Sequence, residues 1–454
     1  MTEKRNDDKN GPDQFSEEGS GTSRDEKQGD LSDDLSENTP DDLSGFMAKN
    51  LPGSALSSFT GPLKDALNRM QVGQGISPDE SKSRSISLLS SLSEFDSDSV
   101  STAFTFGSAG VQADHAHYFN GFALLKPMRR GTAVSVGISE GTSVRLVVGS
   151  EHESSVFELD SLQDDTQDLV VRIVREMLTS LPIPPPRGLD VAIVSAVPAG
   201  FTSAYISSLS VSLVRALEEL LGIEREENER VKSINESLER VLSYPLSVAF
   251  VIASESASPD SFVLVDTETL EHLILDDSST TVPGWALIDT QGDHETTDRA
   301  GRSKRAQEIL ARLQQKQFSE LSSLRDLEHR DLETASHLLP RRMRPGLKYL
   351  VTENRRVQRL VAAIRNEDWQ LMGGLMFMSH ASRRDDWGIT SPIQDFVVDE
   401  AERFTIEGVY GASQVGEGSF VLIAGQPIRL PAFLDHLRNS WPAHASGRPE
   451  TFIL

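Results

Sequence analysis

Segments with strand character and segments with helix character are unevenly distributed along this chain, and their order constrains the fold more than any other feature. β-Branched runs bounded by glycine, at residues 132–136 and 144–148, predict strands of an antiparallel sheet. From residue 299 to residue 375 the apolar pattern is mainly helical. Strands that come mostly first and helices that come mostly later are typical of an α+β protein with two lobes.

The same patterns predict most of the individual elements. A buried strand over residues 189–195 and a long helix over residues 203–221 form a strand–turn–helix unit. The apolar run at residues 246–253 has the length of a strand, and we assign it as one. The other expected elements are helices at 167–181, 224–242 and 430–440, and strands at 262–266, 270–275, 285–289, 407–410 and 420–424.

The first 102 residues differ from the rest of the chain. Residues 1–45 contain 14 acidic and 5 basic side chains and almost no apolar ones, so they cannot offset the entropy of ordering and we expect a disordered acidic tail. That tail either keeps the chain soluble or recruits a protein partner. Residues 46–102 read as a linker in which apolar side chains at helical spacing could form docking helices. We expect two domains after it, at residues 103–283 and 284–454.

Charge and composition exclude several classes of function. The net charge of −25 disfavours nucleic acid and anionic membranes as partners, because phosphate groups would be repelled. The chain has no cysteine, so disulfides, thiol nucleophiles and cysteine-based zinc sites are excluded. The polar start and the lack of long apolar stretches predict neither a secretory signal nor a membrane span. A cytoplasmic location is the expectation.

Four motifs occur in order between residue 113 and residue 422. They are ADHAHYFNGF at 113–122, followed by Arg-Gly-Thr at 130–132; VPAGFTSAYISSL at 197–209; VTENRRV at 351–357 with MSHASRRDDWGITSPIQD at 378–395; and GASQVGEGSFVL at 411–422. Each is similar to a block of the galactokinase family, in the order that the family keeps. From about residue 100 to its end the chain therefore resembles a divergent galactokinase of the GHMP kinase superfamily, which also holds homoserine, mevalonate and phosphomevalonate kinases.

The resemblance implies a fold, a reaction and a set of site residues. The fold is the two-lobed GHMP kinase fold, with an N-terminal mixed sheet and helices and a C-terminal α/β sandwich-like lobe. The family reaction is ATP-dependent phosphorylation of galactose at its 1-hydroxyl, with Mg²⁺. The residues that fall on the family's binding positions are Asp114, His115 and His117 for the sugar, Pro198, Gly200, Thr202, Ser203 and Ser207 for the nucleotide, and Glu236 for the metal.

The family's chemistry is incompletely carried over. Aligned on Phe250, the position of the family's catalytic aspartate holds Val248, and residues 245–253 contain no carboxylate. The position of its catalytic arginine holds Ser108, which cannot balance charge on a transferring phosphoryl group. The phosphate loop carries Tyr205 and Ile206 where the family has small hydroxyl residues.

Three functional hypotheses follow from this pattern. The first is a galactokinase-like protein that is catalytically impaired and binds a sugar or nucleotide in a regulatory role. The second is an active sugar or small-alcohol kinase with relocated catalytic groups, for which Asp114, Glu236, Arg129 and Arg130 are candidates. A purely structural role, with the acidic tail binding a partner, is the third.

Overall fold

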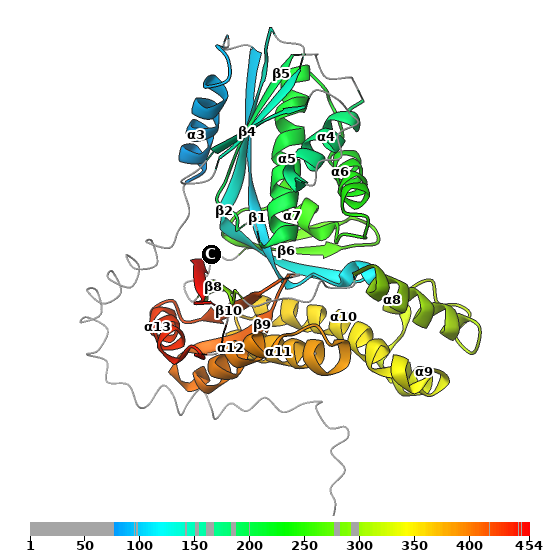
Figure 1. Ribbon diagram of the computed structural model, residues 1–454. Coiled ribbons are helices and arrows are strands. Elements are labelled where there is room, and N and C mark those ends of the chain that lie inside the picture. The colour runs from blue at the N-terminus through cyan, green and yellow to red at the C-terminus, as the bar shows by residue number, and fades with distance from the viewer. Residues whose placement is uncertain are drawn as a thin grey trace, which may run out of the picture. The chain divides into compact units, whose positions relative to one another are not determined.

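The strands in the described part of the chain form two separate sheets (Figure 1). The computed structural model describes residues 77–94, 96, 99–140, 143–149, 154–159, 168–182, 188–198, 200–276, 282–291, 299–416, 418–443, 445 and 447–454. The acidic tail expected at residues 1–45, and the residues from there to 76, lie outside the described part.

The first sheet has the strand order β4-β3-β5-β2-β6-β7, and β1 pairs with β2. Its members are β1 (Val100–Gln112), β2 (Phe122–Ile138), β3 (Val144–Gly149), β4 (Ser154–Leu159), β5 (Leu189–Ser195), β6 (Ser261–Asp266) and β7 (His272–Asp276). β3 and β5 run parallel, and the other neighbours are antiparallel. The long strand β2 therefore holds the sheet together, because β1, β5 and β6 all pair with it.

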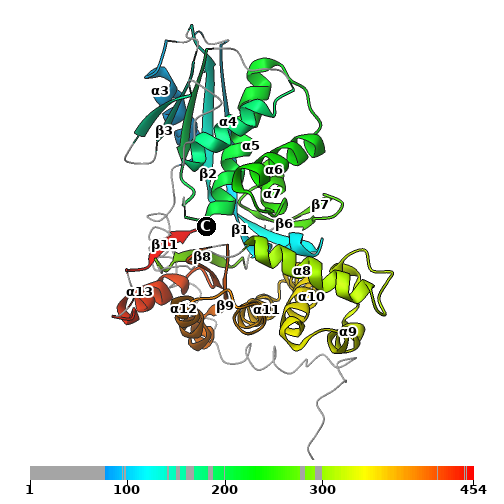
Figure 2. The same ribbon diagram turned by 45° about the vertical axis from the view of Figure 1, so that its right-hand side comes forward.

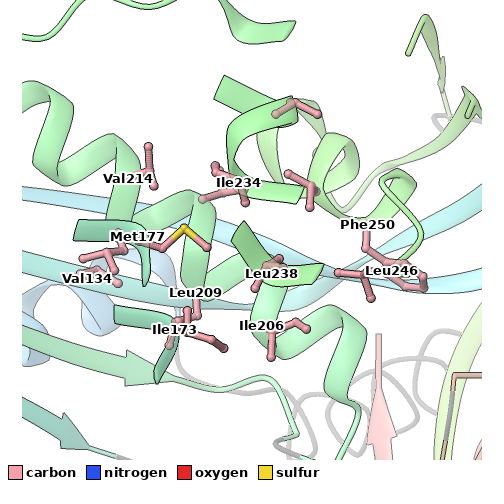
Figure 3. Packing of buried hydrophobic residues seen from close by; sticks show 14 of the residues in the cluster. Val134, Ile173, Met177, Ile206, Leu209, Val214, Ile234, Leu238, Leu246 and Phe250 are labelled. Atoms are coloured by element: carbon pink, nitrogen blue, oxygen red, sulfur yellow. The ribbon is translucent and has the colours of Figure 1, made fainter. Parts of the chain in front are cut away.

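The two faces of this sheet are covered by different helices. Successive side chains of a strand point to opposite faces, and Val134 and Val136 belong to the large apolar cluster under one group of helices (Figure 3). Those helices are α4 (Leu169–Thr179), α5 (Thr202–Leu221), α6 (Glu227–Leu242) and α7 (Ala249–Ser256). On the other face, the hydroxyl of Ser135 lies 2.7 Å from that of Ser85 in α3 (Pro78–Ser90).

The serine-rich stretch before β1 was expected to be a linker in which a helix could form, and it contains the docked helix α3. Pro78 occupies the first turn, and the side chain of Ser77 accepts the N–H of Glu80 at 3.2 Å, which caps the helix start. Leu89 is buried with Val147 and Ala192 of the sheet. The contact of α3 with the sheet is therefore made by Leu89, by the partly buried Leu88 and by two buried serines, despite the polar sequence of the helix.

The assignment of residues 246–253 as a strand was wrong, because this stretch contributes to helix α7 (Ala249–Ser256). All residues from Ala249 to Glu255 are buried, so the sequence shows no polar face and hence no helical period. The carboxylate of Glu255 fixes the helix end, with Arg215 Nη2 at 2.9 Å and Arg230 Nη1 at 2.5 Å.

The second sheet is antiparallel and has the order β11-β8-β10-β9. Its strands are β8 (Gly284–Asp289), β9 (Val409–Gln414), β10 (Phe420–Gly425) and β11 (Glu450–Ile453). The helices that follow β8 are α8 (Arg299–Gln314), α9 (Leu332–Leu338), α10 (Arg344–Arg365), α11 (Trp369–Ser382), α12 (Pro392–Arg403) and α13 (Leu430–Ser440). Figure 2 shows α11, α12 and α13 side by side along this sheet.

Helix α11 packs on β9 at backbone contact distance, and two glycines make this contact. A Cβ atom placed on Gly373 would lie 1.8 Å from the carbonyl oxygen of Tyr410, and one on Gly411 would lie 2.4 Å from the Cα of Gly373. No side chain fits at either position, so the close approach depends on the two glycines.

The two sheets share an apolar cluster. Phe201, at the start of α5, packs on Phe420 of β10 with ring centroids 5.0 Å apart, and Phe262 of β6 packs on Trp285 of β8 at 5.7 Å. These rings belong to one cluster of buried side chains. The change of sheet falls between β7 and β8; the division into domains at residues 283 and 284 stays a prediction.

Candidate functional site

The turn between β1 and β2 carries the three residues predicted to bind sugar. Asp114 and His115 are buried, and His117 is half-buried with its ring centroid 4.1 Å from that of Tyr118. His115 Nδ1 lies 2.7 Å from the hydroxyl oxygen of Tyr349 in α10. The turn is therefore held against α10.

One face of α10 supplies the groups that meet this turn. Tyr349, Glu353 and Arg356 are four and three residues apart, so they project from the same side of the helix. All three are buried. Glu353 is ion-paired with Arg356 and accepts hydrogen bonds from Ser379 Oγ at 3.1 and 3.2 Å. The amide of Gln112, at the end of β1, donates to Ser379 at 3.2 Å.

Arg383 enters the same space from a π-helical turn, Arg383–Trp387, that follows α11. Such turns are rare and often occur at functional sites. Its Nη1 lies 3.3 Å from Asp114 Oδ2, and it also donates to the carbonyl oxygen of Gln414 and to Gln414 Oε1, the latter at 3.1 Å. We call Gln112, Asp114, His115, Tyr349, Glu353, Arg383 and Gln414 the Asp114 cluster.

A histidine behind the cluster orients Gln414. The backbone N–H of Gln414 donates to His380 Nδ1 at 3.1 Å, and His380 Nε2 lies 3.0 Å from Asp395 Oδ1. Because Nδ1 accepts, the proton of a neutral imidazole is on Nε2 and is donated to Asp395. Burial raises the pKa of Asp395, but the hydrogen bonds from His380 and Thr390 outweigh this and the pKa is lowered.

The electrostatics of the Asp114 cluster are dominated by burial. Burial raises the pKa of Asp114, although Arg383 and the backbone of Gly416 act in the opposite direction. Burial likewise raises the pKa of Glu353, opposed by Arg356 and Arg383. For Arg383, burial lowers the pKa, but Tyr349, Asp114 and Glu353 raise it by more. The cluster therefore keeps one cation and two carboxyl groups out of water, with Arg383 in contact with Asp114 and within electrostatic range of Glu353.

The free space inside the cluster is very small. The cavity lined by Asp114, His115, Glu353 and Arg383 has a volume of about 10 Å³. A water molecule needs a cavity of roughly 10–15 Å³ on this measure. The cluster can therefore hold one water at most, and a hexose would have to displace Arg383 or the turn that carries Asp114.

Ser108 and Val248 lie on two elements in contact, because α7 packs on β1. Phe250 of α7 reaches β1, since a Cβ atom on Gly110 would lie 3.4 Å from its ring. Ser108 is 1% exposed, and its hydroxyl has no hydrogen-bond partner among the described residues. Val248 caps the start of α7, is 8% exposed and belongs to the large apolar cluster. Neither side chain is ionised at neutral pH, so neither can replace a carboxylate base or a guanidinium cation.

The predicted phosphate loop connects β5 to α5, as the sequence indicated. Gly200 is exposed and Thr202 half-buried, whereas Phe201 is fully buried against Phe420. A Cβ atom on Gly416 would lie 2.4 Å from the Phe201 ring, so the backbone after β9 packs directly against this ring at Gly416. The first N–H groups of a helix have no hydrogen-bond partner within that helix. In α5, which begins at Thr202, these N–H groups directly follow the loop.

Comparison with known proteins gives one consistent result, although no protein-family model matches the chain. The galactokinase of Thermotoga maritima is 24% identical over 322 residues, which are 69% of this chain and 85% of that protein. The galactokinase of Chloroflexus aggregans is 27% identical over 323 residues, 69% of this chain and 80% of that protein. The solved structure of Lactococcus lactis galactokinase complexed with galactose superposes with a TM-score of 0.73 at 17% identity, covering 82% of this chain and 96% of that one.

The chain is a divergent relative of the galactokinases. A mevalonate kinase from Methanococcus jannaschii superposes with a TM-score of 0.54 at 13% identity, covering 78% of this chain and 96% of that one. The α+β fold of GHMP kinase type that the sequence predicted is confirmed. None of the described helices of this galactokinase-like chain has the length and apolarity that a membrane crossing requires.

The serines predicted to bind nucleotide point into this galactokinase-like fold. Ser203 and Ser207 are buried. The next serine, Ser208, is 2.9 Å from the hydroxyl of Thr132 in β2, so the residues after the first turn of α5 face the sheet. Of the predicted nucleotide-binding set, Pro198, Gly200 and Thr202 alone keep some exposure.

Glu236, predicted as the magnesium ligand of the galactokinase-like site, is exposed on α6. Leu238, two residues later, packs in the same apolar cluster as Ile206 of α5 (Figure 3). Two residues correspond to about 200° around a helix, so Glu236 faces away from the start of α5. No group of three or more His, Asp or Glu that could hold a metal occurs in the described ranges. Because Glu236 faces away, it is not directed at a magnesium ion bound beside the loop at the start of α5.

Glu239, one turn after Glu236, is the α6 carboxylate directed inward. Its Oε1 accepts the backbone N–H of Leu246 at 3.3 Å, just before α7. A helix face with several glutamates does not reveal from sequence alone which of them is turned inward.

Sequence reasoning missed the α10 and π-turn members of the Asp114 cluster. Tyr349, Glu353 and Arg383 lie more than 230 residues from Asp114 in the sequence. A signal was present, because Glu353 and Arg383 belong to the motifs VTENRRV and SHASRRDD. Those motifs indicated the family resemblance, but no spacing rule connects them to the turn at Asp114.

Proposed function

We propose that this galactokinase-like protein is impaired in phosphoryl transfer and acts as a nucleotide- or sugar-binding regulatory protein. The reaction of the family is ATP-dependent phosphorylation of galactose. The observation that carries the proposal is that Ser108 and Val248, the residues that the resemblance assigns to the family's arginine and aspartate positions, are both buried and uncharged.

The chemistry of phosphoryl transfer explains why Ser108 and Val248 predict a loss of activity. Transfer of a phosphoryl group needs a group that orients the attacking hydroxyl and a cation that balances the developing charge. A valine methyl and a buried serine hydroxyl do neither. Loss of a single such group typically costs a factor of 10² or more in kcat, so loss of both removes most of the rate.

Of the two ligand classes, the geometry favours a nucleotide over a hexose. Gly200 and Thr202 are accessible next to the N-terminus of a 20-residue helix, where N–H groups and the helix dipole favour an anion. The space next to Asp114 measures about 10 Å³. A hexose would have to separate Asp114 from Arg383, which leaves two buried charges without their partner.

The alternative is an active kinase with relocated groups, and one observation favours it. Arg130 is buried beside the loop that leads to α5, donating to the carbonyl oxygen of Ala196 at 3.3 Å with its guanidinium 5.2 Å from the ring of Phe452. A guanidinium at this place could meet a nucleotide phosphate.

An ADP-release assay separates the two proposals. The full chain is tested with ATP·Mg²⁺ and with galactose, other hexoses or mevalonate, and we expect no ADP release above the protein-free blank. Turnover that scales with protein concentration, disappears in Arg130→Ala and survives in the neighbouring Arg129→Ala would establish the active kinase. Arg129 is a matched control because it is half exposed and paired with Asp260 at the surface.

Thermal unfolding tests binding independently of catalysis. A ligand present at about 100 times its Kd adds roughly 2.7 kcal/mol to the free energy of unfolding. We expect ATP·Mg²⁺ to raise the Tm with such a concentration dependence, and galactose to have little effect. Constant Tm with every ligand would contradict a ligand-binding role and leave only the structural one.

A further inference from the structure

A groove on the outer side of α10 has a charge that is unusual for this protein. Its volume is about 530 Å³, and α10, α11 and the π-helical turn line it. Four of its lining residues are cations of α10: Lys348, Arg355, Arg356 and Arg359. The chain as a whole has a net charge of −25, so a groove with four cations on one helix and two carboxylates, Asp385 and Asp386, stands out.

Two of these cations are not neutralised. Lys348 Nζ is paired with Asp386 Oδ2 at 3.0 Å, and Arg356 is paired with the buried Glu353. Arg355 and Arg359 are exposed, and within the part of the chain that the structure describes neither makes a salt bridge. They are four residues apart on one helix face, where like charges repel each other. An anion bound between them would relieve this repulsion.

The other groups of the groove restrict the kind of anion. Asp385 of the π-helical turn also lines the groove and is paired with Arg384 at 2.9 Å, and its carboxylate oxygens can still accept hydrogen bonds from hydroxyl groups. Thr352 and Ser382 add hydroxyls, and Met378, which is 55% exposed, adds an apolar surface. The combination of arginines for a phosphate and carboxylates for hydroxyl groups suits a phosphorylated polyol.

We infer that this groove is a binding site for a small phosphate monoester of a sugar. The phosphate is held by Arg355 and Arg359, and the sugar hydroxyls face Asp385. A volume of about 530 Å³ lies within the usual range of small-ligand pockets, roughly 300–1,000 Å³. A long acidic peptide fits less well, because Arg355 and Arg359 alone among the groove's α10 cations lack an ion-pair partner in the described residues, which suits one phosphate group rather than a row of carboxylates. The site is separate from the Asp114 cluster and does not depend on the function proposed above.

The groove is nevertheless connected to the Asp114 cluster. Arg356 lines the groove, and its partner Glu353 lines the cavity beside Asp114. Arg356 also donates to Thr352 Oγ1 at 3.0 Å, a second groove residue. An anion that draws Arg356 outward weakens its pairing with Glu353. Binding in the groove therefore changes the charge balance of the Asp114 cluster, to which Glu353 belongs.

Isothermal titration calorimetry of the full chain, at low salt and neutral pH, tests the inference. Glucose 6-phosphate and galactose 1-phosphate are the probes, with inorganic phosphate and poly-glutamate for comparison. We expect both sugar phosphates to bind more tightly than inorganic phosphate, and the double variant Arg355→Gln/Arg359→Gln to weaken them at least about tenfold, since each arginine makes a charge-assisted contact. Arg365→Gln, an exposed arginine on the same helix outside this groove, should leave the affinity unchanged.

Two results would overturn the inference. The first is an equal affinity of the double variant and the wild type for sugar phosphates, or no binding to the wild type. The second is tighter binding of poly-glutamate than of any sugar phosphate, which would assign the groove to an acidic polypeptide. Circular dichroism verifies that the double variant is folded, and Arg359→Lys, which keeps the charge, should retain part of the affinity.

Discussion

Arg383 is the largest of the almost completely buried side chains in the described part of the chain, and it carries a charge. Its guanidinium is held by Asp114 and by the backbone of Gln414, while Glu353 contributes a second negative charge nearby. A buried pair of this kind adds little net stability but is costly to break, because the remaining charge stays out of water.

Removing one member of the pair should therefore be expensive. We expect Asp114→Ala to lower the free energy of unfolding by about 3–5 kcal/mol, measured by urea denaturation at pH 7. Asp114→Asn keeps the shape and one hydrogen-bond acceptor for Arg383, so its cost should be clearly smaller. Equal, small losses for the two variants would show that Arg383 finds another partner.

Restoring the family's carboxylate at residue 248 should also be costly. Val248 is 8% exposed and surrounded by apolar side chains, and an aspartate there would be desolvated without a partner. We expect Val248→Asp to lose about 3 kcal/mol of stability, and Val248→Ala about half as much, by urea denaturation. A cost for aspartate no larger than for alanine would indicate a hydrated site.

At the residue scale, the sequence predicted the turn but not its partners. Asp114 and His115 were recognised from a motif of ten residues. Their partners Tyr349 and Arg383 come from α10 and the π-helical turn, and only the tertiary fold brings these together. The exposure of Glu236 was equally hidden, because one-residue uncertainty in the phase of a helix rotates a side chain by about 100°.

At the scale of elements, tight packing is concentrated in the contact of α11 with β9. Gly373 and Gly374 are neighbours in sequence but differ completely in surroundings. A Cβ atom on Gly373 would meet the backbone of Tyr410 at 1.8 Å, whereas nothing lies within 4 Å of one on Gly374.

The two glycines make a matched pair of alanine variants. Gly373→Ala should lose several kcal/mol or fail to fold, because the obstacle is backbone that cannot rotate away. Gly374→Ala should be stabilising by about 0.5–1 kcal/mol, since alanine favours helix over glycine. Thermal and urea unfolding of both proteins check this, and similar behaviour of the two variants would contradict the close contact.

A second element contact should show itself in the pH dependence of stability. Arg325 is paired with Asp266 at the end of β6, with 2.7 Å between Nη1 and Oδ1. Burial raises the pKa of Asp266, but the hydrogen bonds from Arg325 and the backbone outweigh it, so the pKa is lowered below its ordinary value of 3.8. A lowered folded-state pKa gives stability that is present above 3.8 and is lost as the pH falls through the folded value.

Asp266→Asn should therefore cost about 1–2 kcal/mol at pH 7, as for a hydrogen bond to a charged group. The difference from the wild type should shrink as the pH falls below 3.8. Urea denaturation of both proteins across this range measures it. A difference that is independent of pH would mean that the charge of Asp266 is unimportant.

The strands themselves were only partly predictable. β2 spans Phe122–Ile138, but only residues 132–136 read as a strand, because Lys126, Arg129 and Arg130 interrupt the apolar pattern. The structure accommodates Lys126 by letting its ammonium donate to the carbonyl oxygen of Pro259 at 2.9 Å. β1 was missed since its alternation of Ser, Thr, Gly and Ala gives little hydrophobic contrast.

For the molecule as a whole, the shared apolar cluster predicts that both sheets unfold together. The described residues from 77 onward belong to one compact unit, and the pairs Phe201–Phe420 and Phe262–Trp285 connect the sheets. All four tryptophans lie at residue 285 or later, so their fluorescence reports on the second sheet and its helices, whereas far-UV circular dichroism reports on both sheets.

We expect the fluorescence and circular dichroism transitions in urea to coincide. Phe420→Ala should shift both midpoints by the same amount, with a loss of about 3–5 kcal/mol, the usual range for a buried phenylalanine. Separate transitions in the wild type, or a shift confined to fluorescence, would show that the two sheets are independent folding units.

Helix α3 has a practical consequence for anyone who shortens this protein for crystallisation. Because Leu89 covers Val147 and Ala192 of the first sheet, a chain that begins after Ser90 would present these side chains to solvent. Ser135 would at the same time lose the hydroxyl of Ser85. A trimmed version that starts at or before Ser77, and so keeps the cap of α3, should remain monodisperse at concentrations where the shorter one aggregates.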